Sequence, residues 1–206
     1  MLSLSKLALL LAVTRHALAL PADDIEARGC NKVRSSFDVT PDQPVIPADV
    51  QVITYDGPTY TMTTDDWAAR ENATANGLPW DAPAGVPRIT LQPGQLLDFG
   101  ITTDITKRSG NRFIGAFGGY NCPTLTYIVG VKNFGCGTGC ISITTSALSG
   151  IVQQQYHHNP YPTMDVWAGA GCSGTRLQHF GVQTTSSCTN VNNCSGFSSF
   201  IGYYNC

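Results

Sequence analysis

The chain has 206 residues, of which 14 are acidic and 12 are basic, and its formal net charge is −2. This near balance, without any run of basic residues, gives nucleic acid no strong electrostatic attachment, and we expect no nucleic-acid partner. Eight cysteines in surroundings rich in Gly, Ser and Thr are typical of a chain that folds where thiols oxidise.

Residues 1–20 have the pattern of a secretory signal peptide. Lys6 provides the positive charge, residues 7–13 form a short apolar run, and Ala17-Leu18-Ala19 supplies the small residues that precede a cleavage site. The apolar run is too short to span a bilayer. We therefore expect a secreted, extracellular protein, the alternative for this segment being a buried N-terminal helix.

Two basic sites resemble those cut by kexin-type proteases in fungal secreted precursors. Both end an aliphatic-x-x-Arg pattern, one at Arg28 and the other at Lys107-Arg108. The alternative is that both are exposed basic residues in the loops of one continuous domain. Cleavage would divide the precursor into a signal peptide (1–20), a short propeptide (21–28), an acidic, Pro-rich pro-segment or N-terminal domain (29–108) and a cysteine-rich β module (109–206).

The composition changes at the second of these sites. Residues 29–108 hold six basic and ten acidic side chains, a net charge of −4. Residues 109–206 hold three basic side chains and one acidic side chain, a net charge of +2. The acidic segment could therefore mask a mildly basic module until processing. Its own sequence predicts strands over 50–55 and 60–64 around an Asp-Gly turn signal, a short helix over 65–70, and a strand over 96–101.

Short β-rich runs follow one another through residues 109–206, separated by Gly, Pro, Asn and Ser. They cover 125–129, 141–144, 164–167 and 200–204. Short strands at this spacing indicate a sandwich or barrel. We expect a mainly β fold, a disulfide-stabilised two-motif Greek-key sandwich, preceded by a Pro-rich, partly β leader segment.

An internal repeat accounts for the two motifs. Residues 117–122 and 167–172 share the pattern aromatic-x-Gly-x-x-Cys, and each is followed by a Gly-Val pair. The glycine predicts a tight turn that the aromatic ring covers and the cysteine cross-links. In this alignment the second cysteine of each unit is Cys136 or Cys188, and the third is Cys140 or Cys194.

These aromatic-Gly-Cys units, with Cys172-Ser173-Gly174 and the terminal Tyr204-Asn205-Cys206, resemble those of fungal small secreted cysteine-rich proteins. Some of these are effector-like or killer-toxin-like. The duplicated strand pattern resembles βγ-crystallin-type Greek keys over residues 109–206. Crystallin-type calcium sites need acidic side chains, and Asp165 is the single acid here, so the resemblance implies no metal site.

A disulfide framework is the expected role of the cysteines, rather than a metal site or a nucleophile. Residues 109–206 hold an odd number of them, so Cys30 is expected to bridge into that module; a free thiol or an intermolecular bridge is the alternative. The protein would then be a monomer or, if cut after Arg108, a disulfide-tethered two-chain form. Eight cysteines allow 105 pairings. They are Cys30, Cys122, Cys136, Cys140, Cys172, Cys188, Cys194 and Cys206.

Two N-glycosylation sequons fit a secreted chain, at Asn72 and at Asn193. Candidate catalytic groups are few. A single carboxylate, Asp165, excludes an ordinary glycosidase within residues 109–206, because such enzymes need two. His157-His158 and His179 could form an exposed loop, a zinc or copper site, or an acid–base site; we expect no metal, no cofactor and no catalytic residue.

The sequence therefore favours a secreted, non-enzymatic effector or toxin-like protein that binds a protein, glycan or membrane target outside the producing cell. The alternatives are a carbohydrate- or cell-wall-binding module and a small histidine-dependent hydrolase. The aromatic side chains that could stack on sugars are Tyr120, Tyr127, Tyr156, Tyr161, Trp167, Tyr203 and Tyr204.

Overall fold

The computed structural model describes residues 36–38 (backbone), 46–58, 60–100, 112–155, 161–182 and 184–204. Several predicted features lie outside these residues, and the predictions made for them stay predictions. They are the signal peptide (1–20), the propeptide (21–28), the processing residues Arg28, Lys107 and Arg108, the cysteines Cys30 and Cys206, and His157 and His158.

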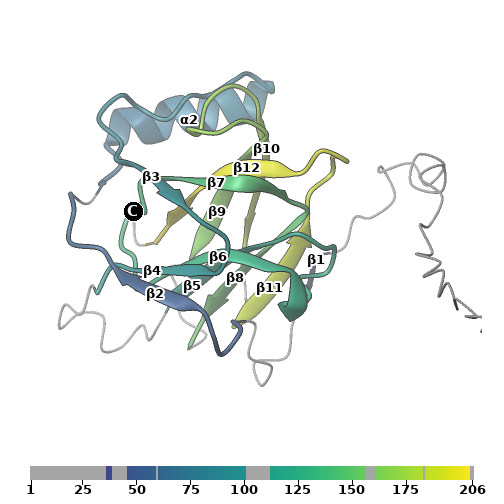
Figure 1. Ribbon diagram of the computed structural model, residues 1–206. Helices are drawn as coiled ribbons and strands as arrows, with labels where there is room; N and C mark the ends of the chain where they lie inside the picture. Colours follow the sequence, from purple (N-terminus) through teal and green to yellow (C-terminus); the bar gives the residue numbers. More distant parts are fainter. Residues whose placement is uncertain are drawn as a thin grey trace, which may run out of the picture.

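Two β-sheets face each other in a sandwich, and one helix lies outside it (Figure 1). The larger sheet has the strand order β1-β11-β8-β5-β6-β4-β2 and the smaller has β10-β9-β12-β7-β3. The mainly β, disulfide-stabilised sandwich expected from the sequence is confirmed. The strands and helices are β1 (Ser36–Asp38), β2 (Gln51–Thr54), α2 (Thr64–Asn76), β3 (Arg88–Leu91), β4 (Gln95–Asp98), β5 (Arg112–Phe117), the 3-10 turn η3 (Thr124–Thr126), β6 (Tyr127–Lys132), β7 (Cys140–Ala147), β8 (Ser149–Gln154), β9 (Thr163–Trp167), β10 (Arg176–Gly181), β11 (Ser186–Asn190) and β12 (Phe197–Tyr203).

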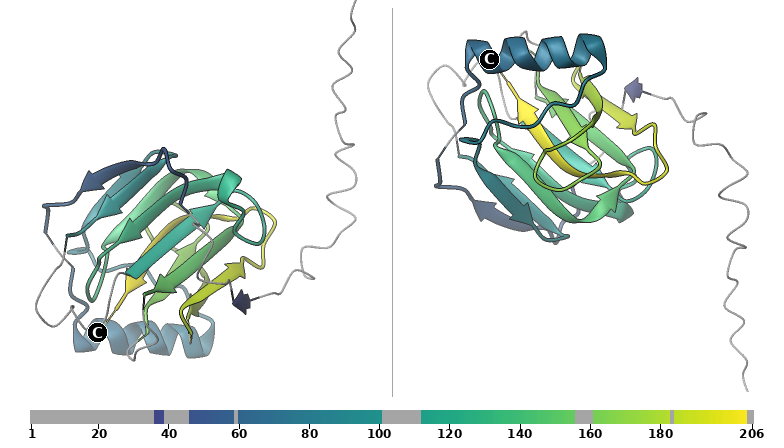
Figure 2. Two further views of the ribbon diagram at one scale, coloured as in Figure 1. Left: turned by 90° about the horizontal axis from the view of Figure 1, so that it is seen from below. Right: turned by 90° about the horizontal axis from the view of Figure 1, so that it is seen from above.

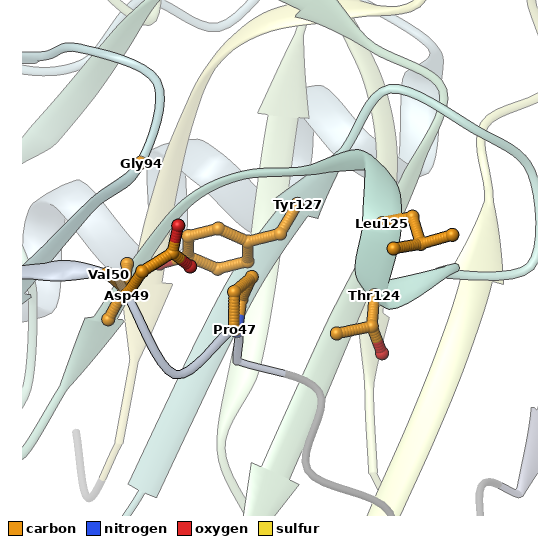
Figure 3. Close-up of a pocket in the computed structure, with 7 residues that line it drawn as sticks. All are labelled: Pro47, Asp49, Val50, Gly94, Thr124, Leu125 and Tyr127. Atoms are coloured by element: carbon orange, nitrogen blue, oxygen red, sulfur yellow. The ribbon is translucent and has the colours of Figure 1, made fainter.

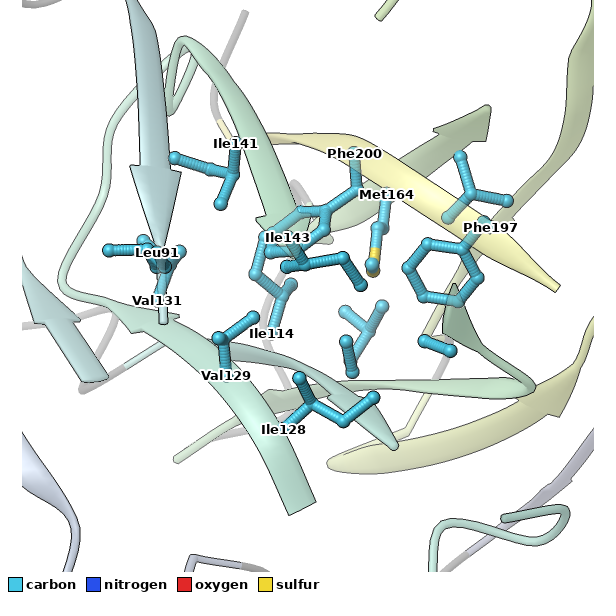
Figure 4. Close-up of a cluster of buried hydrophobic side chains, with 14 of the residues drawn as sticks. Leu91, Ile114, Ile128, Val129, Val131, Ile141, Ile143, Met164, Phe197 and Phe200 are labelled. Atoms are coloured by element: carbon cyan, nitrogen blue, oxygen red, sulfur yellow. The ribbon is translucent and has the colours of Figure 1, made fainter. Parts of the chain in front are cut away.

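The main hydrophobic core fills the space between the sheets (Figure 4). Ile114 of the larger sheet meets Met164 and Phe200 of the smaller one, and all three are fully buried. The acidic segment contributes to this core as well, through Leu91 in β3 and Leu97 in β4. Residues from both sides of the composition boundary therefore share one core.

Strands β5–β8 and β9–β12 form two units of four strands that exchange one strand each. In the larger sheet, β6, β5 and β8 of the first unit continue into β11 of the second. In the smaller sheet, β10, β9 and β12 of the second unit continue into β7 of the first. The third strand of each unit thus completes the sheet of the other, and the two units form one interlocked sandwich.

The repeated turns have the same hydrogen bonds in both units. Ser149 Oγ accepts from Cys122 N at 3.0 Å and donates to Gly119 O at 2.6 Å. Fifty residues later, Ser199 Oγ accepts from Cys172 N at 3.0 Å and donates to Gly169 O at 2.5 Å. Both cysteines have a positive φ, 50° and 52°, which a non-glycine residue adopts at a cost. These matching turns support a duplicated unit.

Each of these turn cysteines is joined to the exchanged strand that completes its sheet. Cys122 pairs with Cys188 of β11, and Cys172 pairs with Cys140 of β7. The structure therefore matches Cys140 with Cys188 between the units, whereas the sequence alignment matched Cys136 with Cys188. The match of Cys136 with Cys188 was wrong because Cys136 lies before the exchanged strand β7, whereas Cys188 lies within the exchanged strand β11. Cys136 and Cys194 are each in a disulfide bond as well.

Four strands of the acidic segment extend the two sheets, and β1 does so by antiparallel pairing with β11. Parallel pairing places β4 between β2 and β6, and β3 against β7. The hairpin expected around Asp56-Gly57 does not form: β2 pairs with β4 instead, and Tyr60 makes only an isolated bridge to Gly137. Local alternation identified β2 and β4 but could not identify distant, parallel partners.

Helix α2 covers the outer face of the smaller sheet, and both views of Figure 2 show it outside the sandwich. It begins with a capping box between Thr63 and Asp66 and ends at Gly77 in the left-handed conformation. The sequence predicted its start, and the helix runs longer than expected. It helps to enclose a second core in which Trp80 stacks on Trp167 at 5.8 Å.

Candidate functional site

Asp165, the single carboxylate of residues 109–206, lies at the centre of a buried ionic cluster beneath α2. It points outward from β9, its side chain is 0% exposed, and it faces the helix. Arg70 of α2 donates to both of its oxygens, from Nε at 2.7 Å and from Nη2 at 3.0 Å. Arg176 of β10 adds a third hydrogen bond at 3.1 Å. The cluster thus joins the acidic segment to the second β unit.

A β-bulge aims two side chains of β10 at this carboxylate. The register shifts between Arg176 and Gln178, so that Arg176 and His179 both lie on the outer face beside Asp165. His179 Nδ1 lies 2.7 Å from Asp165 Oδ1 and 2.8 Å from Arg70 Nη2. Since a carboxylate only accepts, the shorter contact assigns a proton to Nδ1.

The charge of Asp165 is strongly stabilised. Burial by itself raises the pKa of this carboxyl, but hydrogen bonds from His179 and Arg70, with the positive charge of Arg70, outweigh burial and lower the pKa to about 2. The carboxylate therefore stays ionised over the range in which proteins usually work. An ionised Asp165 in turn holds α2 against the sheet through Arg70.

Aromatic rings enclose the Arg70 guanidinium on the remaining sides. It lies 4.7 Å from the Trp67 ring and 5.1 Å from the Tyr203 ring. The hydroxyls of Tyr60 and Tyr203 are buried and have no hydrogen-bond partner among the described residues. Burial raises the pKa of Tyr60 to about 12, with a further contribution from Asp66, so this hydroxyl stays protonated. Arg70, Arg176 and Asp165 are packed as in a core, whereas His179, at 39%, and Trp67, at 38%, are the accessible members of the cluster.

A second feature is an open groove on the larger sheet, where the acidic segment meets the turn before β6 (Figure 3). Its volume is about 330 Å³. Figure 3 shows the Tyr127 ring between Asp49 and Pro47 on one side and the η3 turn on the other. The lining residues are Pro47, Asp49, Val50, Gly94, Thr124, Leu125 and Tyr127.

Leu125 is the most exposed large apolar residue of the described chain, at 100%, and it lies at the edge of this groove. The Tyr127 ring, which also lines the groove, is held in place by its hydroxyl, which donates to Gln95 O at 2.9 Å, and by an edge contact with Phe117 at 5.8 Å. The groove therefore combines a fixed aromatic ring with a fully exposed leucine at its edge.

The structure places the residues predicted from the sequence in different surroundings. Asp165 and His179 are brought together, and Asn72 is exposed on α2, whereas Asn193 is partly buried. Of the aromatic residues considered for sugar stacking, Trp167, Tyr203 and Tyr204 are buried and pack in the cores. Sequence reasoning missed Arg70, Arg176 and the groove. Nothing in the local sequence marks them, because each depends on contacts between distant segments.

Comparison of the chain with protein-family models, with curated proteins and with solved structures found no match. Within the described part of the chain, no three His, Cys, Asp or Glu side chains group as they would to hold a metal ion. None of the described helices has the length and apolar character needed to cross a membrane.

Proposed function

We propose that this protein is a secreted, non-enzymatic effector or toxin-like protein that binds a target outside the producing cell. The groove beside Leu125 is its contact site. This role agrees with the resemblance to fungal small secreted cysteine-rich proteins and with an extracellular location. The observation that carries the proposal is a fully exposed leucine beside an open groove of about 330 Å³.

The rigidity of the surrounding structure supports a binding role. The turn that bears Leu125 follows Cys122, which is bonded to Cys188 on another strand. Gly119 N donates to Thr126 Oγ1 at 3.0 Å and ties the other end of the turn to the same unit. A preorganised apolar tip loses little conformational entropy on binding, which increases the affinity that its burial can provide.

The burial and the contacts of Asp165 support the same proposal. Both of its oxygens are engaged by arginine or histidine side chains, and the group is fully buried. A carboxylate enclosed in this way stabilises the fold and is not accessible to a substrate. Residues 109–206 then contribute no further carboxylate for hydrolysis.

The test is to apply the purified secreted protein to plant, fungal or bacterial cells and to insoluble polysaccharides, and to record cell death or retention. We expect Leu125→Asp to weaken the response about tenfold or more, because it places a charge in an apolar contact. Leu78→Asp is the matched control, since Leu78 is also exposed, at 53%, and does not line the groove. Equal responses of both variants and the unchanged protein would refute this contact site.

The Asp165–His179 pair favours one alternative, a small histidine-dependent hydrolase. A carboxylate that orients an imidazole and leaves its other nitrogen accessible is the arrangement of a general base. Turnover of a glycan, ester or nucleic acid that His179→Ala abolishes in a still folded protein would establish this alternative. Under our proposal, the binding response is unchanged in that variant.

A further inference from the structure

We infer that the groove accepts a lysine or arginine side chain presented by a target protein. This inference rests on the proposed function and specifies the chemistry of its partner. Asp49 lines the groove, is exposed, and forms no ion pair with any described residue. Among the described lining residues it is the single charged group, so none of them supplies a counter-ion to this carboxylate.

Comparison of the two β units shows that this carboxylate is unusual. Each unit is covered beside its turn by a stretch of the acidic segment: Trp80 and Ala82 pack by Cys172, and Ile46 and Val50 pack by Cys122. Each stretch also carries an aspartate. Asp81 accepts a hydrogen bond from Gly174 N in the turn of the second unit. Asp49, in the first unit, faces the groove instead.

The walls of the groove fit the rest of a long basic side chain. Pro47 and Val50 provide apolar surface for its methylene groups, and Tyr127 and Asp49 both line the groove (Figure 3). A cation between a carboxylate and an aromatic ring is stabilised by both. The same chemistry already occurs in this fold, where the Arg112 guanidinium lies 4.0 Å from the Tyr204 ring. Leu125 would then contact an apolar neighbour of the basic residue.

The net charge of the acidic segment favours the approach of such a partner at long range, while Asp49 is the acid that lines the groove itself and four others, Asp65, Asp66, Glu71 and Asp81, lie on or beside α2 at the other sheet. Residues 46–100 hold seven acidic and two basic side chains, a net charge of −5, and one of the two bases, Arg70, is buried. An acidic surface raises the rate at which a basic partner meets the groove. The acidic segment, on this view, is part of the recognition surface and does not mask the module.

The probes are acetylated, amidated tetrapeptides Gly-Lys-Leu-Gly and Gly-Arg-Leu-Gly, with Gly-norleucine-Leu-Gly as the uncharged counterpart. Titrated into the isotopically labelled full-length protein, the two basic peptides should shift the backbone signals of Gly94, Thr124 and Tyr127, and the norleucine peptide should bind about fivefold more weakly. Raising the salt from about 0.1 M to about 1 M, which shortens the Debye length to about 3 Å, should remove that difference. Equal binding of all three peptides overturns the inference.

Two variants separate a local contact from general electrostatics. Asp49→Asn should remove the preference for the basic peptides, whereas Asp56→Asn, which removes an exposed charge of the same segment outside the groove, should preserve it. A preference that survives Asp49→Asn contradicts the inference.

The target assay distinguishes this inference from the proposed function. If Leu125→Asp weakens the response and Asp49→Asn does not, the binding site stands and the basic ligand is wrong. If neither variant has an effect, both proposals are wrong. If Leu125→Asp and Asp49→Asn each weaken the response and Asp56→Asn does not, the result supports the proposed function and the basic ligand together. Retention on polysaccharide that Leu125→Asp abolishes, but that Asp49→Asn and salt leave unchanged, would assign the groove to sugar and overturn the basic-ligand inference.

Discussion

Arg70 and Asp165 lie 95 positions apart in the sequence, yet one guanidinium holds both oxygens of a carboxylate that is fully buried. One partner belongs to the acidic segment and the other to the cysteine-rich half. This pair makes stability a property of the whole chain and leads directly to two predictions.

The first prediction concerns the pair itself. Asp165→Asn should lower the free energy of unfolding by about 3 kcal/mol, because it leaves the Arg70 charge buried without its counter-ion. Glu71→Gln is the matched control: Glu71 also pairs with Arg70, but its side chain is 54% exposed, and the change should cost less than about 1 kcal/mol. Urea unfolding followed by fluorescence measures both values. Equal losses in the two variants would show that burial does not decide the strength of the pair.

The same pair predicts a specific dependence on pH. The pKa of Asp165 is about 2 in the folded protein, whereas an unperturbed aspartate, as in the unfolded chain, has a pKa of 3.8. Between these two pH values the folded state therefore binds fewer protons than the unfolded state. The pair's contribution, on the order of 2 kcal/mol, is therefore complete above about pH 4 and is lost as the pH falls toward 2. Unfolding curves from pH 7 to pH 2 should converge for the unchanged protein and Asp165→Asn. A constant difference across that range would contradict the low pKa.

The third prediction concerns a chain cut between residues 100 and 112, for example after Arg108. We expect the two pieces to remain bound without a covalent link, because β4 is hydrogen-bonded between β2 and β6, and α2 is held by Arg70. Protease treatment of a Cys30→Ser variant, which cannot form a bridge through that residue, should give two bands under denaturing conditions and one peak in native gel filtration. Separation of the pieces in native buffer would refute this expectation.

The fourth prediction uses the two equivalent serines. Ser149→Ala and Ser199→Ala should each cost about 2 kcal/mol, since each leaves a buried cysteine N–H and a glycine carbonyl without their partner. Ser198→Ala, a partly buried neighbour, should change the stability by less than about 0.5 kcal/mol. Thermal or urea unfolding gives all three values. A marked difference between the two buried serines would argue against equivalent turns.

Glycosylation gives the fifth prediction. Asn72 is exposed on α2, whereas Asn193 is partly buried, with its side-chain oxygen enclosed, and precedes the disulfide-bonded Cys194. We expect a glycan at Asn72 and none at Asn193. Intact-mass analysis of the protein expressed through a eukaryotic secretory pathway should show a loss of glycan mass in Asn72→Gln but not in Asn193→Gln or Asn76→Gln. A glycan that persists in Asn72→Gln would contradict the prediction.

The sequence could identify the elements whose signals are local. Alternation and turn residues indicated β7, β9 and β12, and the acidic residues after Thr63 indicated the start of α2. Alternation indicated β2 and β4 as well, but it did not indicate β3, and the sheet partners of all three could not be obtained, because parallel pairing with distant strands leaves no nearby turn signal. The disulfide between Cys140 and Cys172 was equally inaccessible, since it follows from the strand exchange.

In the candidate sites, too, the sequence indicated single residues but not the contacts between distant segments. His179 and Asp165 were identified as residue types that could carry chemistry, but the bulge that turns His179 and Arg176 toward Asp165 is a feature of backbone geometry. Leu125 and Asp49 drew no attention because an isolated leucine and an isolated aspartate carry no pattern. Only the fold places them at the same groove.

The exchange of β7 and β11 also determines when this chain can fold. The larger sheet needs β11 and the smaller sheet needs β12, and these strands lie within residues 186–203. Neither sheet can be completed before these two strands have been synthesised. Their pairing joins segments far apart in the chain, which makes folding slow. A chain of this design must stay soluble until both strands are available to pair.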